Sequence, residues 1–393
     1  MKRVYYQVIK NRLQEPRKFI QVIYGPRQVG KTTLMKQVLN DLDMPCLFET
    51  ADDIIGADNT WLRKLWDKAR FLAKQNNGAE VVLVIDEIQK IHNWCETVKK
   101  EWDSDSFNDV QLKVAVLGSS SLLTRQGLTE SLAGRFETIH IPHWSFVEMQ
   151  EAFGLTLEQF VWFGGYPGPI HLSGDESRWK RYVRESLIET SVSKDVLMMT
   201  RVDKPALLRR LFEIGSSYSS QILSLTKIQA ELMEKGNITT LSNYLGLLSS
   251  AGLLCGLEKY SGEIIRKRSS RPKFQVFNNA LISSQSAYDF KQAIADSKLW
   301  GRVVESSVGA HLLNLSSELD YNLYYWNENS NEVDFVIEKG EKVVAIEVKS
   351  GKDSTNPGMA EFDLRFHPKS MYTVGTDGIP LEDFFRTNPL DLF

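Results

Sequence analysis

The chain carries a short glycine-bounded loop whose residue types suit the binding of a polyphosphate. An apolar run ends at Gly25, four residues follow, and then come Gly30, Lys31 and Thr32, which is the spacing G-x-x-x-x-G-K-[ST]. The glycines let the backbone wrap around an anion, so that its N–H groups and the start of the next helix face the phosphates. We expect Lys31 to contact the β- and γ-phosphates and Thr32 to hold Mg²⁺. The residues expected to contact the nucleotide are Gly25, Pro26, Arg27, Gln28, Val29, Gly30, Lys31, Thr32 and Thr33.

Two adjacent acidic residues supply what hydrolysis needs beyond nucleotide binding. Asp86 and Glu87 follow residues 81–85, and five consecutive apolar residues favour a strand buried on both faces of a parallel sheet. The carboxyl end of such a strand is where these sheets place ligands. Asp86 is therefore predicted to bind Mg²⁺ through a water molecule, and Glu87 to act as the general base for the attacking water. The alternative is a buried strand that ends in a solvated acidic turn.

Two further positions have both a catalytic and a structural interpretation. The apolar run 112–117 ends in Gly-Ser-Ser-Ser, so that Ser119 or Ser120 would lie beside the γ-phosphate as a sensor. The same serines are also suited to cap a helix that begins near Leu122. Arg135, within Ala-Gly-Arg-Phe, is either an arginine finger that acts on a neighbouring subunit or a structural salt-bridge residue. The sequence does not decide between these two roles.

A second group of chemically active residues lies in the last part of the chain. Asp334 falls in the strand-like run 332–337, and Glu347 and Lys349 fall together in or directly after the run 343–348. Residues two apart in a strand point to the same face, and an adjacent strand can bring Asp334 beside them. Two carboxylates that bind Mg²⁺ and a lysine that orients water are what metal-dependent phosphodiester cleavage needs. The alternative is a sheet with ordinary charges at its edge.

The elements that must position these residues are an alternating series of strands and helices. Five predicted strands over about the first 150 residues indicate a doubly wound parallel α/β sheet of the P-loop NTPase type. The character of the chain changes after Pro142, and turn-rich residues follow at 164–169. We therefore divide the chain into an ATPase domain (1–150), a helical lid or linker (151–204), a winged-helix domain (205–282) and a C-terminal α/β domain (283–393).

The winged-helix prediction rests on the order of elements in the third region. Three helical segments (206–214, 225–233 and 240–250) precede a predicted hairpin, which is the layout in which the third helix reads DNA. The predicted wing, residues 259–273, holds six basic residues and one acidic residue, a charge suited to phosphate contacts. The third helix, however, has no Lys or Arg. DNA binding and protein packing are therefore both open for this domain.

Composition sets broad limits on the remaining possibilities. The 393 residues are 42% hydrophobic and 25% charged, with a net charge of −3, so no global basic field indicates nucleic acid. The three cysteines, Cys46, Cys95 and Cys255, are too far apart for a C-x-x-C motif, which fits a reducing cytoplasm. The charged N-terminus lacks a signal peptide, and no apolar run reaches the length of a membrane span.

The chain as a whole resembles a bacterial and archaeal family of AAA-type ATPases with a C-terminal domain of unknown function. The resemblance begins with Tyr-Gly-Pro-Arg-Gln-Val-Gly-Lys-Thr (24–32), Ile-Asp-Glu-Ile-Gln-Lys (85–90) and Leu-Gly-Ser-Ser-Ser (117–121). It continues with Ala-Gly-Arg-Phe (133–136), Gly-Gly-Tyr-Pro (164–167) and Arg-Pro-Lys-Phe-Gln-Val-Phe-Asn (271–278). The resemblance implies an AAA-type fold and ATP binding. The sequence leaves assembly into a homo-oligomer open.

The C-terminal part is similar to the PD-(D/E)xK nuclease fold, also called restriction-endonuclease-like. Asp334, Glu347 and Lys349 fall on that motif, and Glu305 falls on the helical acid of some branches, while Val333 replaces the usual proline. This similarity implies Asp334, Glu347 and Glu305 as metal ligands. A complete hydrolysis site upstream of a winged-helix pattern and a nuclease-like motif leaves two functions open. The first is a cytoplasmic ATPase whose cycle regulates a DNA-binding, DNA-cleaving C-terminal half. The second is an ATP-dependent switch with a catalytically inactive docking domain.

Overall fold

The computed structural model describes residues 1–52, 56–120, 131–196, 202–232, 237–262, 271–351 and 357–393. Within these, the chain forms two compact units: the first comprises residues 1–141, and the second comprises the described residues from Pro142 onward. Each unit is described by itself. None of the described helices is both long enough and apolar enough to span a lipid bilayer.

The first unit is built on a parallel sheet of five strands in the order β2-β3-β4-β1-β5. β3 and β4 are buried along their whole length, because helices cover both faces of the sheet, and most of their side chains are apolar. The buried polar exceptions are Lys113 and, at the carboxyl ends of the strands, Asp86 and Ser119. The strand bounds are β1 (Ile20–Gly25), β2 (Cys46–Thr50), β3 (Val81–Asp86), β4 (Leu112–Ser119) and β5 (Phe136–His140).

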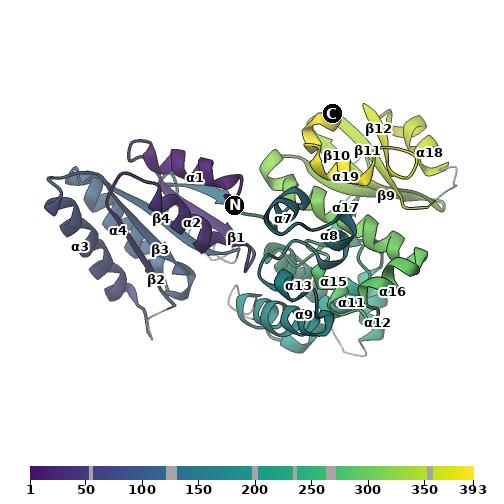
Figure 1. The fold of residues 1–393 in the computed structure, drawn as a ribbon, viewed down its shortest axis with the longest axis horizontal. Coiled ribbons are helices and arrows are strands. Elements are labelled where there is room, and N and C mark those ends of the chain that lie inside the picture. Colours follow the sequence, from purple (N-terminus) through teal and green to yellow (C-terminus); the bar gives the residue numbers. More distant parts are fainter. Residues whose placement is uncertain (53–55, 121–130, 197–201, 233–236, 263–270, 352–356) are drawn as a thin grey trace. The chain divides into compact units, whose positions relative to one another are not determined.

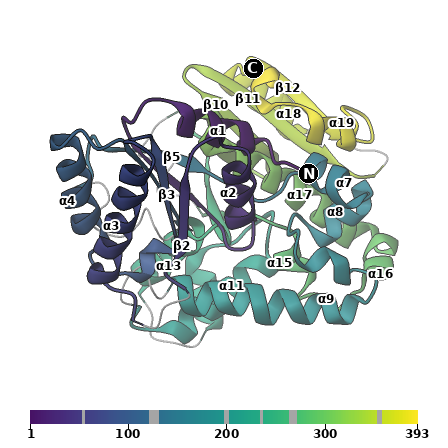
Figure 2. The same cartoon turned by 60° about the vertical axis from the view of Figure 1, so that its left-hand side comes forward.

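Helices lie on both faces of this sheet, with the contacting pair α1 and α2 on one side and the contacting pair α3 and α4 on the other (Figures 1 and 2). α3 begins where the Asp58 carboxylate accepts hydrogen bonds from the N–H groups of Thr60 and Trp61. Trp66 of α3 and Arg70 both bind the buried carboxylate of Asp105 in α4 and so fix the two helices together. The bounds are α1 (Tyr5–Gln14), α2 (Lys31–Asn40), α3 (Asn59–Gln75), η1 (Ile88–Lys90) and α4 (Trp94–Phe107).

The second unit starts with short helices joined by tight turns. Capping boxes open two of them, at Ser145 with Glu148 and at Thr156 with Gln159. The Gly-Gly turn that follows is held by the buried Asn278, whose Oδ1 accepts a hydrogen bond from the N–H of Gly165. The bounds are α7 (Phe146–Phe153), α8 (Leu157–Phe163), η2 (Pro169–Leu172), α9 (Glu176–Tyr182) and the π-helical segments η3 (Val183–Ile188) and η4 (Ser191–Val196).

In the described residues between 202 and 276, three helices and three strands follow, with β8 lying between β6 and β7 and antiparallel to both. β7 continues the sheet by pairing in parallel with β9, so that one seven-stranded sheet has the order β12-β11-β10-β9-β7-β8-β6. The bounds are α11 (Pro205–Ser217), β6 (Gln221–Ile222), α12 (Leu225–Glu231), α13 (Ile238–Ser250), β7 (Leu254–Lys259) and β8 (Lys273–Val276).

The long helix α17 contacts β8, β9 and β11 of this sheet and lies beneath its C-terminal strands (Figure 1). Trp326, Val336 and Ala345, from β9, β10 and β11, belong to one apolar cluster. Both faces of β10 and β11 are buried, since their neighbours Phe335, Ile337, Val344 and Ile346 are also completely buried. The remaining bounds are α15 (Ala280–Ser283), α16 (Phe290–Ala295), α17 (Ser297–Leu319), β9 (Asn322–Glu328), β10 (Asn331–Lys339), β11 (Lys342–Lys349), α18 (Pro357–Phe366), β12 (Ser370–Gly375), α19 (Leu381–Arg386) and η5 (Pro389–Leu392).

Candidate functional site

The glycine-bounded loop joins the end of β1 to the start of α2, as its spacing predicts. Gly25 has no room for a side chain, because a Cβ there would lie 2.0 Å from the carbonyl oxygen of Ile141. Gly30 precedes the helix with a φ of 87°, a left-handed conformation that favours glycine. The loop therefore turns sharply into α2. The first N–H groups of a helix have no acceptor within the helix, and a glycine loop that leads into them is the arrangement that binds phosphate.

Lys31 folds back onto this loop. Its Nζ donates to the carbonyl oxygens of Gly25 at 2.9 Å and Pro26 at 2.7 Å, and the residue is only 8% exposed. Both acceptors are neutral backbone groups. A phosphate oxygen is a stronger acceptor for an ammonium because both partners are charged. The lysine is thus held in the loop by contacts that an incoming polyphosphate can replace.

Thr32 and Asp86 lie side by side at the edge of the sheet. The Thr32 hydroxyl donates to Asp86 Oδ2 at 2.6 Å, and Asp86 Oδ1 accepts from the N–H of Glu87 at 2.9 Å. Hydroxyl and carboxylate oxygens are the ligands that Mg²⁺ prefers, with water and phosphate oxygens completing its shell. The donor set at this position fits a magnesium ion.

Glu87 stands next to this pair in a left-handed conformation, with a φ of 54°. Its Oε2 accepts from Gln89 Nε2 at 2.7 Å, and the same amide nitrogen lies 3.5 Å from Ser119 Oγ. Ser119 is the register partner of Gly25, so the sensor position and the loop lie on neighbouring strands. Gln89 was not singled out from the sequence, although it stands in the same acidic motif. It links the predicted base to the predicted sensor.

The structure places Arg135 in an ion pair within its own chain. Its Nε and Nη2 donate to the two carboxylate oxygens of Asp103 in α4, at 2.7 and 3.0 Å. Of the two roles left open by the sequence, this bidentate contact favours the structural one. Ser120, the other sensor candidate, is buried directly after β4. The helix that the serines were expected to cap, near Leu122, lies outside the described residues.

Two residues beside the loop were not predicted from the sequence. Arg3, which is buried, donates from Nη1 to the carbonyl oxygen of Val29 at 3.1 Å. His140, at the end of β5, packs its ring 4.9 Å from the ring of Tyr24. Burial, together with the positive charges of Lys31 and Arg3, lowers the pKa of His140 to about 4. The imidazole is therefore neutral at physiological pH.

The acidic residues of the second unit gather around a lysine. Lys273 of β8 is completely buried, and its Nζ lies 2.7 Å from Glu305 Oε1, 3.2 Å from Glu332 Oε1 and 3.5 Å from Asp334 Oδ1. It also donates to the carbonyl oxygen of Asp334 and lies 5.0 Å from the centre of the Phe335 ring. Burial lowers the pKa of Lys273, but its three acidic neighbours outweigh that effect and raise the pKa above its usual range. Burial raises the pKa of Glu305, and the ammonium opposes that rise.

The other members of the predicted nuclease motif form a separate pair. Lys349 Nζ lies 2.8 Å from Glu347 Oε1, and Asp334 uses its Oδ2 to accept from the N–H of Val348 at 2.8 Å. Across the described part of the chain, no three His, Cys, Asp or Glu side chains are placed to hold a metal ion together. The predicted metal ligands Glu305, Asp334 and Glu347 are thus occupied by two lysines, and the site does not fit the metal that the nuclease-like resemblance implies. Glu332 and Lys273 were missed as members of this cluster.

Lys273 was also expected to belong to the basic wing, and here the structure corrects the prediction. A completely buried ammonium paired with carboxylates cannot contact the phosphates of a nucleic acid. Lys259, at the other end of the predicted wing, lies 4.0 Å from the Glu328 carboxylate. Residues 263–270, which carry Arg266, Lys267 and Arg268, lie outside the described residues.

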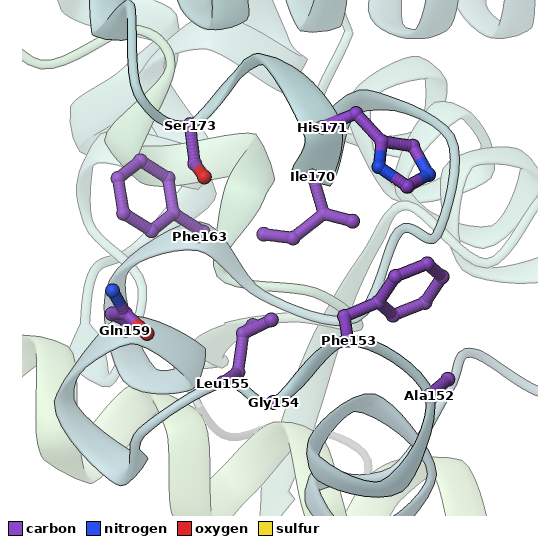
Figure 3. Close-up of a pocket in the computed structure, with 9 residues that line it drawn as sticks. All are labelled: Ala152, Phe153, Gly154, Leu155, Gln159, Phe163, Ile170, His171 and Ser173. Atoms are coloured by element: carbon purple, nitrogen blue, oxygen red, sulfur yellow. The ribbon is translucent and has the colours of Figure 1, made fainter.

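A pocket of about 460 Å³ lies elsewhere in the second unit, between α7, α8 and η2 (Figure 3). Gln159 in its wall belongs to the capping box of α8, and the His171 ring packs edge-on against Phe153 at 5.4 Å. None of the predicted site residues lines it. The lining residues are Ala152, Phe153, Gly154, Leu155, Gln159, Phe163, Ile170, His171 and Ser173.

Comparison with known protein families agrees with the geometry of the first unit. Residues 17–150 match the model of an AAA domain. Residues 155–291 and 300–391 match two domains of unknown function, DUF8612 and DUF4143. The AAA match and the loop geometry together support an AAA-type ATPase domain that binds ATP, built on the predicted parallel α/β sheet.

Two relatives align with most of the chain. An uncharacterized protein of Methanocaldococcus jannaschii is 27% identical over 392 residues, which cover 92% of this chain and 81% of that protein. An uncharacterized protein of Mycobacterium tuberculosis is 25% identical over 379 residues, which cover 94% of this chain and 80% of that protein. Among solved structures, the Walker-type ATPase of Pyrococcus abyssi has a TM-score of 0.46 at 15% identity, over 71% of this chain and 94% of that chain. DnaA from Aquifex aeolicus has a TM-score of 0.33 at 16% identity, over 63% of this chain and 87% of that chain.

Proposed function

We propose that the first unit hydrolyses ATP with the help of Mg²⁺. The observation that carries this proposal is the direct contact of Thr32 with Asp86, with Glu87 as the next residue. In P-loop ATPases the hydroxyl and the first carboxylate hold the metal that neutralises charge on the phosphates. Glu87, which does not bind the metal in this proposal, is suited to take a proton from water.

Each residue around the loop has a distinct role in this proposal. Lys31 leaves the carbonyl oxygens of Gly25 and Pro26 and contacts the β- and γ-phosphates. Glu87 orients the attacking water and accepts its proton, while the Gln89 amide keeps the carboxylate directed toward the edge of the sheet. Ser119, within reach of Gln89, senses the γ-phosphate from the neighbouring strand.

The test of this proposal is Glu87→Gln. The variant keeps the shape and the contact with Gln89 but loses the base, so we expect turnover to fall about 10²- to 10⁴-fold while ATP still binds. Phosphate release and binding of a fluorescent ATP analogue measure the two effects separately. Glu15→Gln, at an exposed position after α1, is the matched control and should turn over normally. Undiminished phosphate release from Glu87→Gln would exclude this mechanism.

We further propose that ATP acts as a switch for the second unit, which serves as a docking module without nuclease activity. The contacts of Lys273 favour this function over DNA cleavage, because the carboxylates that a catalytic metal needs are already paired with an ammonium. The loss of Lys273 from the basic wing also weakens the case for phosphate binding there. The docking partner in this proposal is a protein.

Incubation of the full chain with plasmid DNA and RNA in Mg²⁺ or Mn²⁺ tests this second function. We expect no cleavage product, with or without ATP. Cleavage that disappears in Asp334→Asn would contradict the docking proposal and restore the nuclease. A DNA-binding titration at two salt concentrations provides a second measurement, since binding through phosphates weakens steeply as salt rises.

A further inference from the structure

The nuclease-like resemblance calls for a divalent cation held by Glu305, Asp334 and Glu347. In the structure Lys273 lies against Glu305 and Asp334, and Glu347 pairs with Lys349 instead. Metal ions of this class bind oxygen ligands at about 2.0 to 2.6 Å. The carboxylate oxygens of Glu305, Glu332 and Asp334 instead lie 2.7 to 3.5 Å from one nitrogen atom, Lys273 Nζ. The shortest of these distances is that of a charge-assisted hydrogen bond and the other two are those of ion pairs, so an ammonium already occupies the space between the carboxylates.

The position of Lys273 in the fold makes this ammonium a fixed part of the cluster. The residue begins β8, whereas Glu332 and Asp334 belong to β10 and Glu305 belongs to α17. β8 and β10 are not hydrogen-bonded neighbours in the sheet, so the side chain itself joins them. The backbone on either side is anchored as well: Phe274 pairs with β6 and β7, and the Arg271 carbonyl accepts a hydrogen bond from the Tyr325 hydroxyl.

We infer that Lys273 is a built-in cation that takes the place of a divalent metal in the C-terminal domain and excludes it. A single positive charge at the centre of three carboxylates satisfies part of their charge and repels a second cation from the same position. Lys273 itself is completely buried, whereas the side chains of Glu305, Asp334 and Glu332 are 19%, 14% and 38% exposed. Moving the ammonium away would leave Glu305 and Asp334, the two less exposed carboxylates, without their counter-ion, which is costly. The inference rests on the proposal that the second unit does not cleave DNA.

The experiment is a titration of the full chain with Mn²⁺ in the absence of nucleotide, with free Mn²⁺ followed by electron paramagnetic resonance. All variants carry Asp86→Asn so that the first unit contributes no site. The background chain should show no saturable site that depends on Asp334. Lys273→Met keeps the length and removes the charge, so it should gain one Mn²⁺ per chain, bound about tenfold or more tightly than in the background. Adding Asp334→Asn should abolish that gain.

Lys259→Met is the matched control, because Lys259 lies on the neighbouring strand and pairs with the partly exposed Glu328. It should gain no Mn²⁺. Two results would overturn the inference: an Asp334-dependent Mn²⁺ site in the chain that keeps Lys273, or a folded Lys273→Met variant that gains none. An Asp334-dependent Mn²⁺ site can be sought in the chain that keeps Lys273. The inference can therefore be rejected even if Lys273→Met does not fold. DNA cleavage by the wild type tests the docking proposal separately, since a chain can fail to cleave DNA and still bind Mn²⁺.

Discussion

Each unit of this chain places a buried lysine at the centre of its predicted site, and the two lysines have different partners. Lys31 donates to two backbone carbonyl oxygens, whereas Lys273 is surrounded by three carboxylates. A carbonyl is a weaker partner for an ammonium than a charged oxygen. Lys31 can therefore exchange its partners for phosphate, while Lys273 already has the strongest partners available.

The comparison teaches that a lysine in a predicted active site must be judged by what it contacts. Lys31 lies at the end of β1 in a loop where Gly25 and Gly30 leave the backbone N–H groups open to an anion. Lys273 lies between secondary-structure elements that it holds together. Lys31 is therefore placed to bind a phosphate. Lys273 instead occupies the position that a divalent metal would need.

Removal of Lys273 should have the largest effect on stability. Lys273→Met leaves three carboxylates without their buried counter-ion, and breaking a buried ion pair in this way costs about 3–5 kcal/mol. The loss should be confined to the second unit. Hydrogen exchange followed by mass spectrometry should show faster exchange in β8, β10 and α17, with β1 and β3 unchanged.

Lys259→Met, which breaks a partly exposed ion pair with Glu328, is the stability control for that experiment. Its effect should remain within about 1 kcal/mol. If Lys273→Met exchanges as slowly as Lys259→Met, the acidic cluster does not depend on the ammonium and the contrast between the two lysines fails.

Removal of Lys31 should change binding rather than stability. Lys31→Met removes a charge-assisted contact with the phosphates, which is worth about 1.5–3 kcal/mol, so ATP should bind roughly 10- to 100-fold more weakly. Lys31 donates to two loop carbonyls, which are neutral, so the midpoint of unfolding should move little. Titration with a fluorescent ATP analogue and a thermal melt on the same sample measure both quantities. A large loss of stability without a loss of affinity would mean that Lys31 is a structural residue like Lys273.

The sequence predicts the first site far better than the second because of where the contacts lie. Residues 81–86 form a strand with the bounds that their apolar run indicates, and parallel strands bring Asp86 to the same edge as Thr32. The phosphate-binding loop is made of consecutive residues, from Gly25 to Thr32, so its geometry can be predicted from a short sequence pattern. Gln89 could not be predicted in the same way. An amide side chain is neither acid nor base, and only the fold shows that it contacts Glu87 and Ser119.

The second site could not be predicted because its decisive contacts join residues far apart in the sequence. The Arg-Pro-Lys-Phe segment around Lys273 gives no sign that this side chain reaches Glu305 in α17 and Glu332 in β10. The strand that carries Asp334 was predicted, but Glu332 on the same face was passed over. The acidic residues of the nuclease motif are present in the sequence. Lys273, which pairs with two of them, lies in a strand of a different predicted domain, so the motif alone does not reveal the ion pairs.

The smallest expected effect concerns Arg135, the residue for which the sequence left two roles open. Its pair with Asp103 is partly exposed, so Arg135→Ala and Asp103→Ala should each cost about 1 kcal/mol or less. If the ion pair is its whole role, both variants should turn over ATP at nearly the wild-type rate. A loss of about 10³-fold or more in Arg135→Ala alone would instead identify an arginine finger, because only the arginine would then serve the phosphates. Phosphate release measured over a range of protein concentrations decides whether that arginine acts on a second copy of the chain, and with it whether the first unit needs a neighbour to complete its site.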